Sequence, residues 1–555
     1  KKLEVSDRWL KLKDGTWHNL FQDAAKKYSE KEAIVFRDQR MTFGELLGKA
    51  TELAKGLYDI GVRPKDHVAL WMSNRPEWVV CRYGINMLGA VMIPLNTRYK
   101  AEELEYVLSQ SDARVLLMED KFFGRIDAMG ILRGLCPELD NAKSKIPSLT
   151  RFPLLRGIIC LGDSNNGCFT WDEAFQSGKK IADSDIKFEL QNDDLIHIIY
   201  TSGTTGFPKG VMIANSNFIS VICINAELDR FEQGDRFLVS LPLFGNIGLV
   251  THSQTLFQGA TTVLTDRYDV NSTLEILDRE KITHTVFIPT MLVDILAHPD
   301  LDKYDLSSMK NAAVGGAYCP ASLIREVKEK LGWNLTGGYG LVEASGLSTM
   351  VPVGDTPEHI EKTVGLPMPH CELTIRDPVT SEEYPIGREG EICTRETYPG
   401  SQFMKGYYKK PELTAQTIKG EWLHSGDLGM MNADGYVRIT GRVKEMFIVG
   451  GFNVSPPEIE EFLLKHPRVE EVAVLGVPDK RLGEVGSAFI RLRKGQKASP
   501  EEIIGFCKDK IADIKVPRYV FFVEEFPLTP QMKIQKFKLK ELAVRELGLD
   551  ETKQE

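Results

Sequence analysis

The segment with the clearest chemical signature is Tyr200-Thr201-Ser202-Gly203-Thr204-Thr205-Gly206-Phe207-Pro208-Lys209-Gly210. It holds four serine and threonine hydroxyls, three glycines and one lysine in eleven residues, and apolar runs flank it at Leu195 to Ile199 and Val211 to Ile213. This pattern predicts two buried strands joined by a polar loop. Glycines let backbone N–H groups approach an anion, hydroxyls donate to phosphate oxygens, and a lysine adds positive charge. We therefore interpret the segment as a phosphate-binding loop.

The loop is not of the Walker type. A Walker loop needs a lysine directly after a glycine, followed by Ser or Thr and a helix, whereas Pro208 precedes Lys209 here and Gly210 follows it. A plain Gly/Ser/Thr surface loop is the other interpretation, but such a loop would rarely place a lysine between two buried strands.

Four further blocks follow along the chain: Thr336-Gly337-Gly338-Tyr339-Gly340-Leu341-Val342-Glu343, Trp422 to Gly429, Gly441 to Val454, and Phe526 to Lys536. Together with the phosphate loop, in this order and at this spacing, they resemble the acyl-adenylate-forming (AMP-binding) superfamily, in its acyl-CoA synthetase and CoA ligase branch. The resemblance covers nearly the whole chain. It implies ATP, Mg²⁺ and CoA as cofactors and cosubstrates.

The resemblance implies a nucleotide site at residues in several of these blocks. They are Thr201, Ser202, Gly203, Thr204, Thr205, Gly206, Lys209, Gly315, Gly316, Ala317, Gly338, Tyr339, Gly340, Val342, Asp427 and Arg442. Tyr339 would stack on adenine, and the flanking glycines would clear space for the base. Asp427 would accept hydrogen bonds from the ribose hydroxyls, with Arg442 as a second ribose contact.

Glu343 is the metal ligand that the resemblance implies, together with Thr205, because Mg²⁺ between ATP phosphates prefers a carboxylate oxygen. Two positions depart from the family pattern. Val342 stands where the family has a threonine that contacts the α-phosphate, and Met532 stands where it has a glycine. Ser345 is the nearest hydroxyl that could replace the threonine.

The C-terminal blocks imply a moving part. Lys444 matches the family's hinge, Gly450, Gly451 and Phe452 match the segment that lines the pantetheine tunnel for CoA, and Lys533 matches the lysine that reaches the substrate carboxylate and the α-phosphate. Lys536 is the alternative to Lys533. The catalytic residues implied are Lys533, Glu343 and Lys209.

An acyl pocket is expected at Phe244, Gly245, Asn246, Ile288 and Gly315. Many relatives carry a histidine after Pro-Leu-Phe, and Gly245 would open space there. Peptide-synthetase relatives place an aspartate in this region to pair with an amino group, and none is present here. An apolar acid of modest size is therefore expected: short- to medium-chain, alicyclic or aromatic.

Composition and charge exclude several functions. The net charge of −9 gives no general attraction to nucleic acid or to an anionic membrane. No apolar run approaches the ~20 residues of a membrane span. The nine cysteines are scattered without a C-x-x-C pair, which favours reduced thiols in the cytoplasm. A homodimer is one option for the assembly.

The periodicity predicts an α/β fold. Apolar runs alternate with helical patterns, such as the helix that the capping box of Thr42 and Glu45 begins and Gly61 ends. This alternation favours mostly parallel sheets covered on both faces. We expect a large N-terminal domain, residues 1–441, of layered αβ sheets plus a small β-barrel or distorted sheet at 361–441. A smaller, mobile α+β C-terminal domain, residues 442–555, follows.

The expected function is that of an AMP-forming acyl-CoA ligase of fatty acid metabolism. It would convert a carboxylic acid and ATP to an acyl-adenylate and pyrophosphate, and then form the acyl-CoA thioester. One alternative is acyl transfer to a carrier protein, or oxidation as in luciferases. A second is a catalytically silent nucleotide-binding protein, which Val342 and Met532 keep open.

Overall fold

The computed structural model describes residues 2–6, 15–146, 148–163, 166–201, 208–315, 319–397, 400, 403–449, 452–454, 456–479, 481–508, 510–511, 513–528 and 534–549. The chain forms two compact units. Unit 1 comprises Lys1–Leu373, Thr394–Leu423 and Asp434–Tyr436, and unit 2 comprises Thr374–Cys393, His424–Ala433 and Val437–Glu555. The chain passes from one unit to the other more than once, and a single domain boundary after Gly441 stays a prediction.

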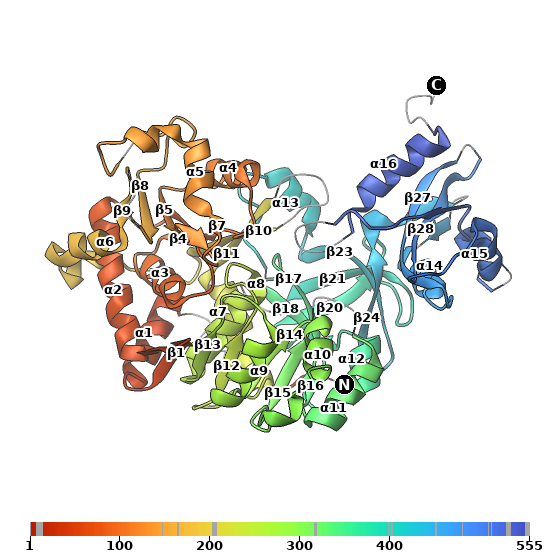
Figure 1. The fold of residues 1–555 in the computed structure, drawn as a ribbon, viewed down its shortest axis with the longest axis horizontal. Helices are drawn as coiled ribbons and strands as arrows, with labels where there is room; N and C mark the ends of the chain where they lie inside the picture. Colours follow the sequence, from red (N-terminus) through yellow and green to blue (C-terminus); the bar gives the residue numbers. More distant parts are fainter. Residues whose placement is uncertain are drawn as a thin grey trace. The chain divides into compact units, whose positions relative to one another are not determined.

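Unit 1 contains two seven-stranded sheets, as the αβ alternation predicted (Figure 1). Sheet A has the order β16-β15-β14-β12-β13-β1-β2. Its strands are β1 (Glu32–Phe36), β2 (Gln39–Thr42), β12 (Arg236–Val239), β13 (Thr261–Leu264), β14 (His284–Phe287), β15 (Asn311–Val314) and β16 (Leu335–Thr336). All neighbours in this sheet are parallel except β1 and β2.

Sheet B has the order β11-β10-β4-β3-β5-β8-β9. Its strands are β3 (His67–Trp71), β4 (Val91–Pro94), β5 (Val115–Glu119), β8 (Gly157–Leu161), β9 (Phe169–Thr170), β10 (Leu195–Thr201) and β11 (Lys209–Ala214). The last two form an antiparallel pair at one edge, which confirms the two strands predicted on either side of the phosphate loop.

Thirteen α-helices belong to the described part of unit 1. They are α1 (Trp17–Lys27), α2 (Phe43–Ile60), α3 (Pro76–Met87), α4 (Ala101–Gln110), α5 (Ala128–Leu135), α6 (Trp171–Ser177), α7 (Asn215–Leu228), α8 (Asn246–Gln258), α9 (Val270–Arg279), α10 (Pro289–Leu296), α11 (Ala321–Leu331), α12 (Pro357–Lys362) and α13 (Pro411–Thr417). Helix α2 shows why such segments fold locally: the Thr42 and Glu45 capping box is formed, and Gly61 ends the helix at φ 109°.

Three hydrophobic clusters give unit 1 its layers. One cluster joins side chains of both sheets to those of α1, α2, α3, α7 and α8, so these helices lie between the sheets. A second joins the other face of sheet B to α4 and α5. A third joins the other face of sheet A to α9, α10 and α11. Strands buried on both faces explain the continuous apolar runs in the sequence.

Smaller sheets form in the β-rich region predicted at 361–441 and in the segment just before it. A three-stranded sheet contains β17 (Gly338–Leu341), β18 (Gly346–Met350) and β19 (Leu366–Pro367). A five-stranded sheet, a partial barrel, contains β20 (Cys371–Arg376), β21 (Gly390–Glu396), β22 (Ile418–Lys419), β23 (Trp422–Met431) and β24 (Val437–Arg442). A two-stranded sheet, β6 (Lys121–Phe122) and β7 (Ile126–Asp127), lies elsewhere in unit 1.

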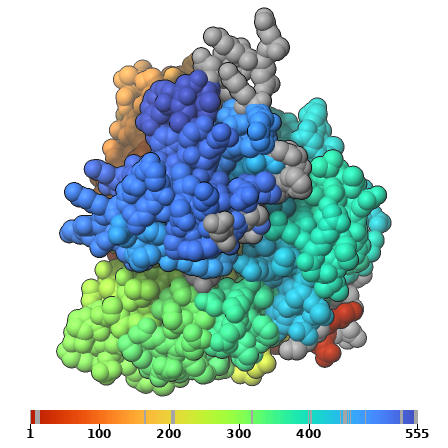
Figure 2. Space-filling model, turned by 90° about the vertical axis from the view of Figure 1, so that its right-hand side faces the viewer, coloured from red at the N-terminus to blue at the C-terminus, as the bar shows by residue number. Residues whose placement is uncertain are grey.

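The C-terminal part of unit 2 is an α+β sandwich, as predicted. Its sheet contains β25 (Phe447–Val449), β26 (Phe452–Val454), β27 (Val469–Asp479), β28 (Gly483–Leu492) and β29 (Tyr519–Phe522), and its helices are α14 (Pro456–Leu463), α15 (Pro500–Cys507) and α16 (Lys536–Leu547). Figure 2 shows its outer surface in shades of blue.

Alternating side chains on β27 separate the two faces of this sheet. Val472 and Val474 pack with α14 and α15, whereas Ala473, Leu475 and Val477 pack with α16. In the described part of the chain, every helix is too short or too polar to cross a lipid bilayer.

Candidate active site

Four segments of the predicted site follow neighbouring strands of sheet A. Phe244 to Asn246 follow β12, Ile288 follows β14, Gly315 follows β15, and Gly337 follows β16. These strands are parallel and adjacent in the order β16-β15-β14-β12. Because the carboxyl ends of parallel strands meet at one edge of a sheet, the segments lie side by side, where open α/β sheets bind their ligands.

Two glycines leave room at this edge. Among the described residues, and leaving aside its chain neighbours, a Cβ placed on Gly315 would meet no atom within 4 Å, and one on Gly245 would meet only the Pro242 carbonyl oxygen, at 3.4 Å. Phe244, Asn246 and Ile288 are all partly exposed. None of the five predicted pocket residues is charged, and Asn246 is the one polar side chain among them.

Tyr339 lies on β17 and is 8% exposed. The structure gives a different physical reason for the glycines beside it than room for a base. A Cβ on Gly338 would stand 2.7 Å from the Thr349 carbonyl oxygen, and one on Gly340 would stand 2.0 Å from that of Gly346. Both glycines are therefore required by the close approach of β18, and their place in nucleotide binding stays a prediction.

The phosphate loop is held at its base by the pairing of Thr201 with Lys209. The Thr201 hydroxyl is buried and has no hydrogen-bond partner among the described residues. Ser202, Gly203, Thr204, Thr205 and Gly206 lie outside the described residues, as do Gly316 and Ala317.

Lys209 and Glu343 lie close together, although Lys209 belongs to the phosphate-loop segment and Glu343 is the last residue of the Tyr339 block. Lys209 Nζ is 3.9 Å from Glu343 Oε1. Tyr407, which the sequence did not single out, bridges them: its hydroxyl donates to Glu343 Oε1 at 2.6 Å and accepts from Lys209 Nζ at 3.2 Å. Burial and the neighbouring carboxylate raise the pKa of Tyr407 well above its usual value, so the phenol keeps its proton.

Ser345 carries a hydroxyl close in sequence to Val342, the residue that stands in place of the family's threonine. Val342 packs against the core of unit 1. Ser345, three residues later, is 1% exposed and adopts φ 60°, and its Oγ has no hydrogen-bond partner among the described residues. A buried hydroxyl without a protein partner is available to a ligand, so Ser345 stays the candidate replacement.

Asp427 and Arg442, the two predicted ribose contacts, form a cross-strand pair in unit 2. They are opposite each other on β23 and β24, and Arg442 Nε forms an ion pair with Asp427 Oδ1 at 2.9 Å. The aspartate is 3% exposed, whereas the arginine side chain is 47% exposed. The arginine therefore fixes one oxygen of a buried carboxylate from the solvent side.

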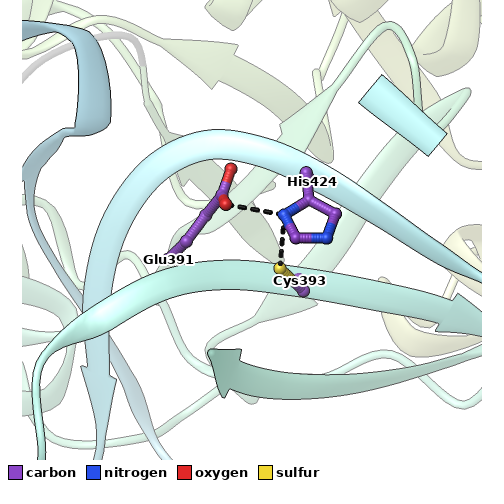
Figure 3. Close-up of side chains that lie close together, drawn as sticks. All are labelled: Glu391, Cys393 and His424. Atoms are coloured by element: carbon purple, nitrogen blue, oxygen red, sulfur yellow. Dashed lines mark hydrogen bonds and ion pairs between the residues drawn. The ribbon is translucent and has the colours of Figure 1, made fainter. Parts of the chain in front are cut away.

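Three buried side chains support the turn before Asp427, and the sequence did not predict their role (Figure 3). His424 Nδ1 lies 2.6 Å from Glu391 Oε2 and 3.5 Å from Cys393 Sγ. The other Glu391 oxygen accepts from the Gly426 N–H at 2.9 Å. Gly426 adopts φ 75°, the left-handed region that favours glycine. These side chain types also ligate metals, but here the carboxylate is already used by two hydrogen-bond donors.

The C-terminal predictions fall partly outside the described residues. Gly450, Gly451 and Lys533 are among those not described. Lys444 lies in the short turn Val443–Glu445, and Phe452 begins β26. Leu528 and Ile534, on either side of 529–533, form an antiparallel bridge.

Lys536, the alternative to Lys533, is committed to two ion pairs. Its Nζ lies 3.1 Å from Glu445 Oε2 and 2.8 Å from Glu460 Oε1, with the side chain 21% exposed. These contacts give Lys536 a structural role inside unit 2. The assignment of Lys533 as the lysine that meets substrate stays a prediction.

Comparisons with known proteins cover most of the chain. The sequence profile described as AMP-binding enzyme matches residues 21–408, and the profile described as AMP-binding enzyme C-terminal domain matches residues 458–533. The putative acyl-CoA synthetase YngI of Bacillus subtilis (strain 168) is 38% identical over 539 residues, which are 96% of this chain and 97% of that protein. The mitochondrial medium-chain acyl-CoA ligase ACSF2 of Danio rerio is 34% identical over 97% of this chain and 90% of its own length.

A similar fold occurs among solved structures. The anthranilate CoA ligase AuaEII in complex with anthranoyl-AMP superposes with a TM-score of 0.79 at 28% sequence identity, covering 96% of this chain and 98% of that one.

Proposed function

The chain belongs to the AMP-binding enzyme family and is an AMP-forming acyl-CoA ligase, and on this premise we propose its substrate and the roles of its residues. The proposed substrate is a carboxylic acid of modest size whose acyl group is apolar: short- to medium-chain, alicyclic or aromatic. The observation that carries this proposal is the uncharged sheet edge formed by Phe244, Gly245, Ile288 and Gly315, with open space at both glycines. A medium-chain ligase and an anthranilate ligase among the similar proteins support it.

The first half-reaction joins two anions. A substrate carboxylate oxygen attacks the α-phosphorus of ATP, pyrophosphate leaves, and an acyl-adenylate forms. In our proposal, Lys209 and the loop hydroxyls neutralise the β- and γ-phosphates, and Lys533 bridges the carboxylate and the α-phosphate. Such catalysis rests on positioning and on charge neutralisation.

Glu343 is the proposed magnesium ligand. Its carboxylate supplies the hard oxygen donor that Mg²⁺ prefers, and a single protein carboxylate suffices when ATP phosphates provide other ligands. The side chain is only 15% exposed and lies beside Lys209, which places a negative group next to the proposed phosphate contact. Thr205 is the second proposed ligand. The ion, when bound, neutralises charge on the phosphates.

The second half-reaction breaks the adenylate. The CoA thiolate attacks the acyl carbon, AMP leaves, and the thioester forms. We propose that residues 442–555 turn about Lys444 between the two steps, which withdraws Lys533 and brings Gly450, Gly451 and Phe452 to line the pantetheine path. Asp427 and Arg442 hold the ribose in both steps.

A reducing compartment suits the cysteines. All nine are buried and none forms a disulfide, which supports the proposed cytoplasmic location. The acid, ATP and CoA are the proposed small-molecule partners, and a homodimer is the assembly to test by sedimentation.

The test is carboxylate-dependent exchange of labelled pyrophosphate into ATP over a panel of acids, followed by CoA thioester formation. We expect exchange to be highest with short- to medium-chain monocarboxylic acids or with acids that carry a single alicyclic or aromatic ring. Exchange with dicarboxylic or amino acids alone would overturn the substrate proposal. A carrier protein that outcompetes CoA for the acyl group would overturn the proposed acceptor.

A further inference from the structure

We propose that Tyr407 is a positioning residue for the adenylation half-reaction, and that its hydroxyl sets the separation and orientation of Lys209 and Glu343. The inference rests on the proposed function, because it concerns the proposed phosphate and magnesium contacts. Tyr407 lies outside the five sequence blocks, and its hydroxyl connects two of them: the phosphate loop, through Lys209, and the Tyr339 block, through Glu343.

A short strap, residues 403–408, carries Tyr407 across the site. Its backbone pairs with β11, directly after the phosphate loop: the Met212 N–H donates to the Gly406 carbonyl at 3.0 Å, and the Tyr408 N–H donates to the Gly210 carbonyl at 2.8 Å. At its other end, the Met404 N–H donates to the Glu343 carbonyl at 2.9 Å. The strap therefore ties the base of the phosphate loop to the backbone of Glu343.

The conformation of the strap aims the Tyr407 ring inward. Gly406 adopts φ 119°, which a side chain would strain, and a Cβ there would stand 2.9 Å from Thr414 Cγ2. The Tyr407 N–H donates to Thr414 Oγ1 at 2.9 Å, and Tyr407 is 3% exposed. With its backbone fixed on both sides and its ring buried, the phenol has little freedom to leave Glu343.

The Tyr407 hydroxyl makes two hydrogen bonds that a phenyl ring alone could not make. It donates to Glu343 Oε1 and accepts from Lys209 Nζ, while Lys209 Nζ also lies 4.5 Å from the ring centroid. Lys209 and Glu343 remain 3.9 Å apart, just beyond direct hydrogen-bond distance. Without the hydroxyl, the two charged groups can close from 3.9 Å to direct hydrogen-bond distance, and they would then have to separate before ATP could bind.

The decisive variant is Tyr407→Phe, which keeps the ring and removes only the hydroxyl. Tyr408→Phe is the matched control, because the neighbouring hydroxyl also donates to a carboxylate, Asp112 Oδ2 at 2.8 Å, away from the site. We expect Tyr407→Phe to lower kcat/KM for ATP in pyrophosphate exchange by about 10- to 100-fold, the usual range for a hydrogen bond to a charged group. Thioester formation from supplied acyl-adenylate should stay within about twofold of wild type.

A binding measurement separates positioning from general damage. We expect the rise in Tm on adding ATP with Mg²⁺ to shrink in Tyr407→Phe, while the Tm of the unliganded protein and the rise in Tyr408→Phe match wild type. In a Glu343→Gln background, removing the Tyr407 hydroxyl should have little further effect, because the two groups act together.

Equal losses in both half-reactions, or full additivity with Glu343→Gln, would overturn the inference. Wild-type exchange in Tyr407→Phe would overturn it as well. A wild-type protein without acid-dependent exchange would instead defeat the proposed function, so the two failures are distinguishable.

Discussion

Asp427 and Arg442 face each other across β23 and β24, with Arg442 Nε 2.9 Å from Asp427 Oδ1. The carboxylate is buried and the guanidinium is half exposed, so the arginine orients a group that is already shielded from water. A pre-oriented carboxylate can accept hydrogen bonds from a vicinal diol without a further loss of side-chain freedom.

Asp427→Asn is expected to raise the KM for ATP by about 10-fold or more, because an amide offers one acceptor oxygen where the carboxylate offers two, and no charge. Initial rates of pyrophosphate exchange over a range of ATP concentrations measure this. Glu461→Gln is the control. It neutralises the carboxylate that lies 2.9 Å from Arg438 at the surface, and Arg438 is on β24, the strand that also carries Arg442. An unchanged KM in Asp427→Asn would rule out the ribose contact.

Lys533→Ala is expected to lower adenylation by about 10²–10³-fold, the range for a lost transition-state contact, and to leave thioester formation from supplied acyl-adenylate nearly intact. Lys536→Ala should instead lower Tm, because it leaves Glu445 and Glu460 without their shared cation. Separate assays of the two half-reactions and a melting curve measure these effects. If the two variants exchange these phenotypes, Lys536 is the catalytic lysine.

Gly451→Trp is expected to behave in the opposite way, with adenylation retained and CoA thioester formation lost, because an indole would block the proposed pantetheine path. Gly505→Trp in α15 is a control for bulk in the same unit, since a Cβ there meets no atom within 4 Å. Normal CoA turnover in Gly451→Trp would reject the tunnel assignment.

Gly245→Phe is expected to shift preference toward shorter acids. The added side chain has room at its Cβ, so it should occupy the acyl pocket without moving the backbone. Each methylene that no longer fits costs about 0.8 kcal/mol, or about fourfold in kcat/KM. The panel of acids used for wild type reads out the shift, and an unchanged chain-length profile would place the acyl chain elsewhere.

The pH dependence of folding should report on Asp229. Burial raises the pKa of its carboxyl from 3.8 to about 7, against hydrogen bonds from Gln254 and Asn311 that lower it. Between those two values the folded chain holds a proton that the unfolded chain releases. The contribution of the Asp229 carboxyl to the free energy of unfolding is therefore complete below about pH 4 and is lost as the pH rises through about 7.

Asp229→Asn should remove part of the dependence of the unfolding free energy on pH. Denaturant titrations at about pH 5 and about pH 8 should show a loss of unfolding free energy in wild type, on the order of 2–4 kcal/mol, that is smaller in the variant. Equal slopes in both proteins would show that the carboxylate is not desolvated in the folded state.

Local sequence signals predicted much of the fold. The Thr42–Glu45 capping box and Gly61 define α2 within their own neighbourhood in the chain, and the apolar runs around the phosphate loop define β10 and β11. Such signals are short-range because caps and strand periodicity involve residues a few positions apart. The resemblance to the family assigned Tyr339, Glu343, Asp427 and Arg442 to one nucleotide site, and this assignment stays a prediction.

The supporting residues could not be found in this way. Tyr407 contacts Glu343 across 64 positions and Lys209 across 198, and no local pattern encodes either contact. His424 was visible in its block, but its partner Glu391 lies 33 positions earlier. Gly338 and Gly340 were recognised as necessary, whereas the reason, the approach of β18, depends on a strand pairing that periodicity does not specify.

The arrangement of the segments after β12, β14 and β15 at one edge of sheet A suggests how the substrate range of this enzyme could change. Each segment of the proposed acyl pocket follows a different strand, so residues 244–246, 288 and 315 can be varied one at a time while the strands beneath stay paired. Directed evolution confined to residues 244–246 and 288 should alter which acids are activated and leave ATP use and folding intact, whereas changes at Gly315, which is also a predicted nucleotide contact, should affect both.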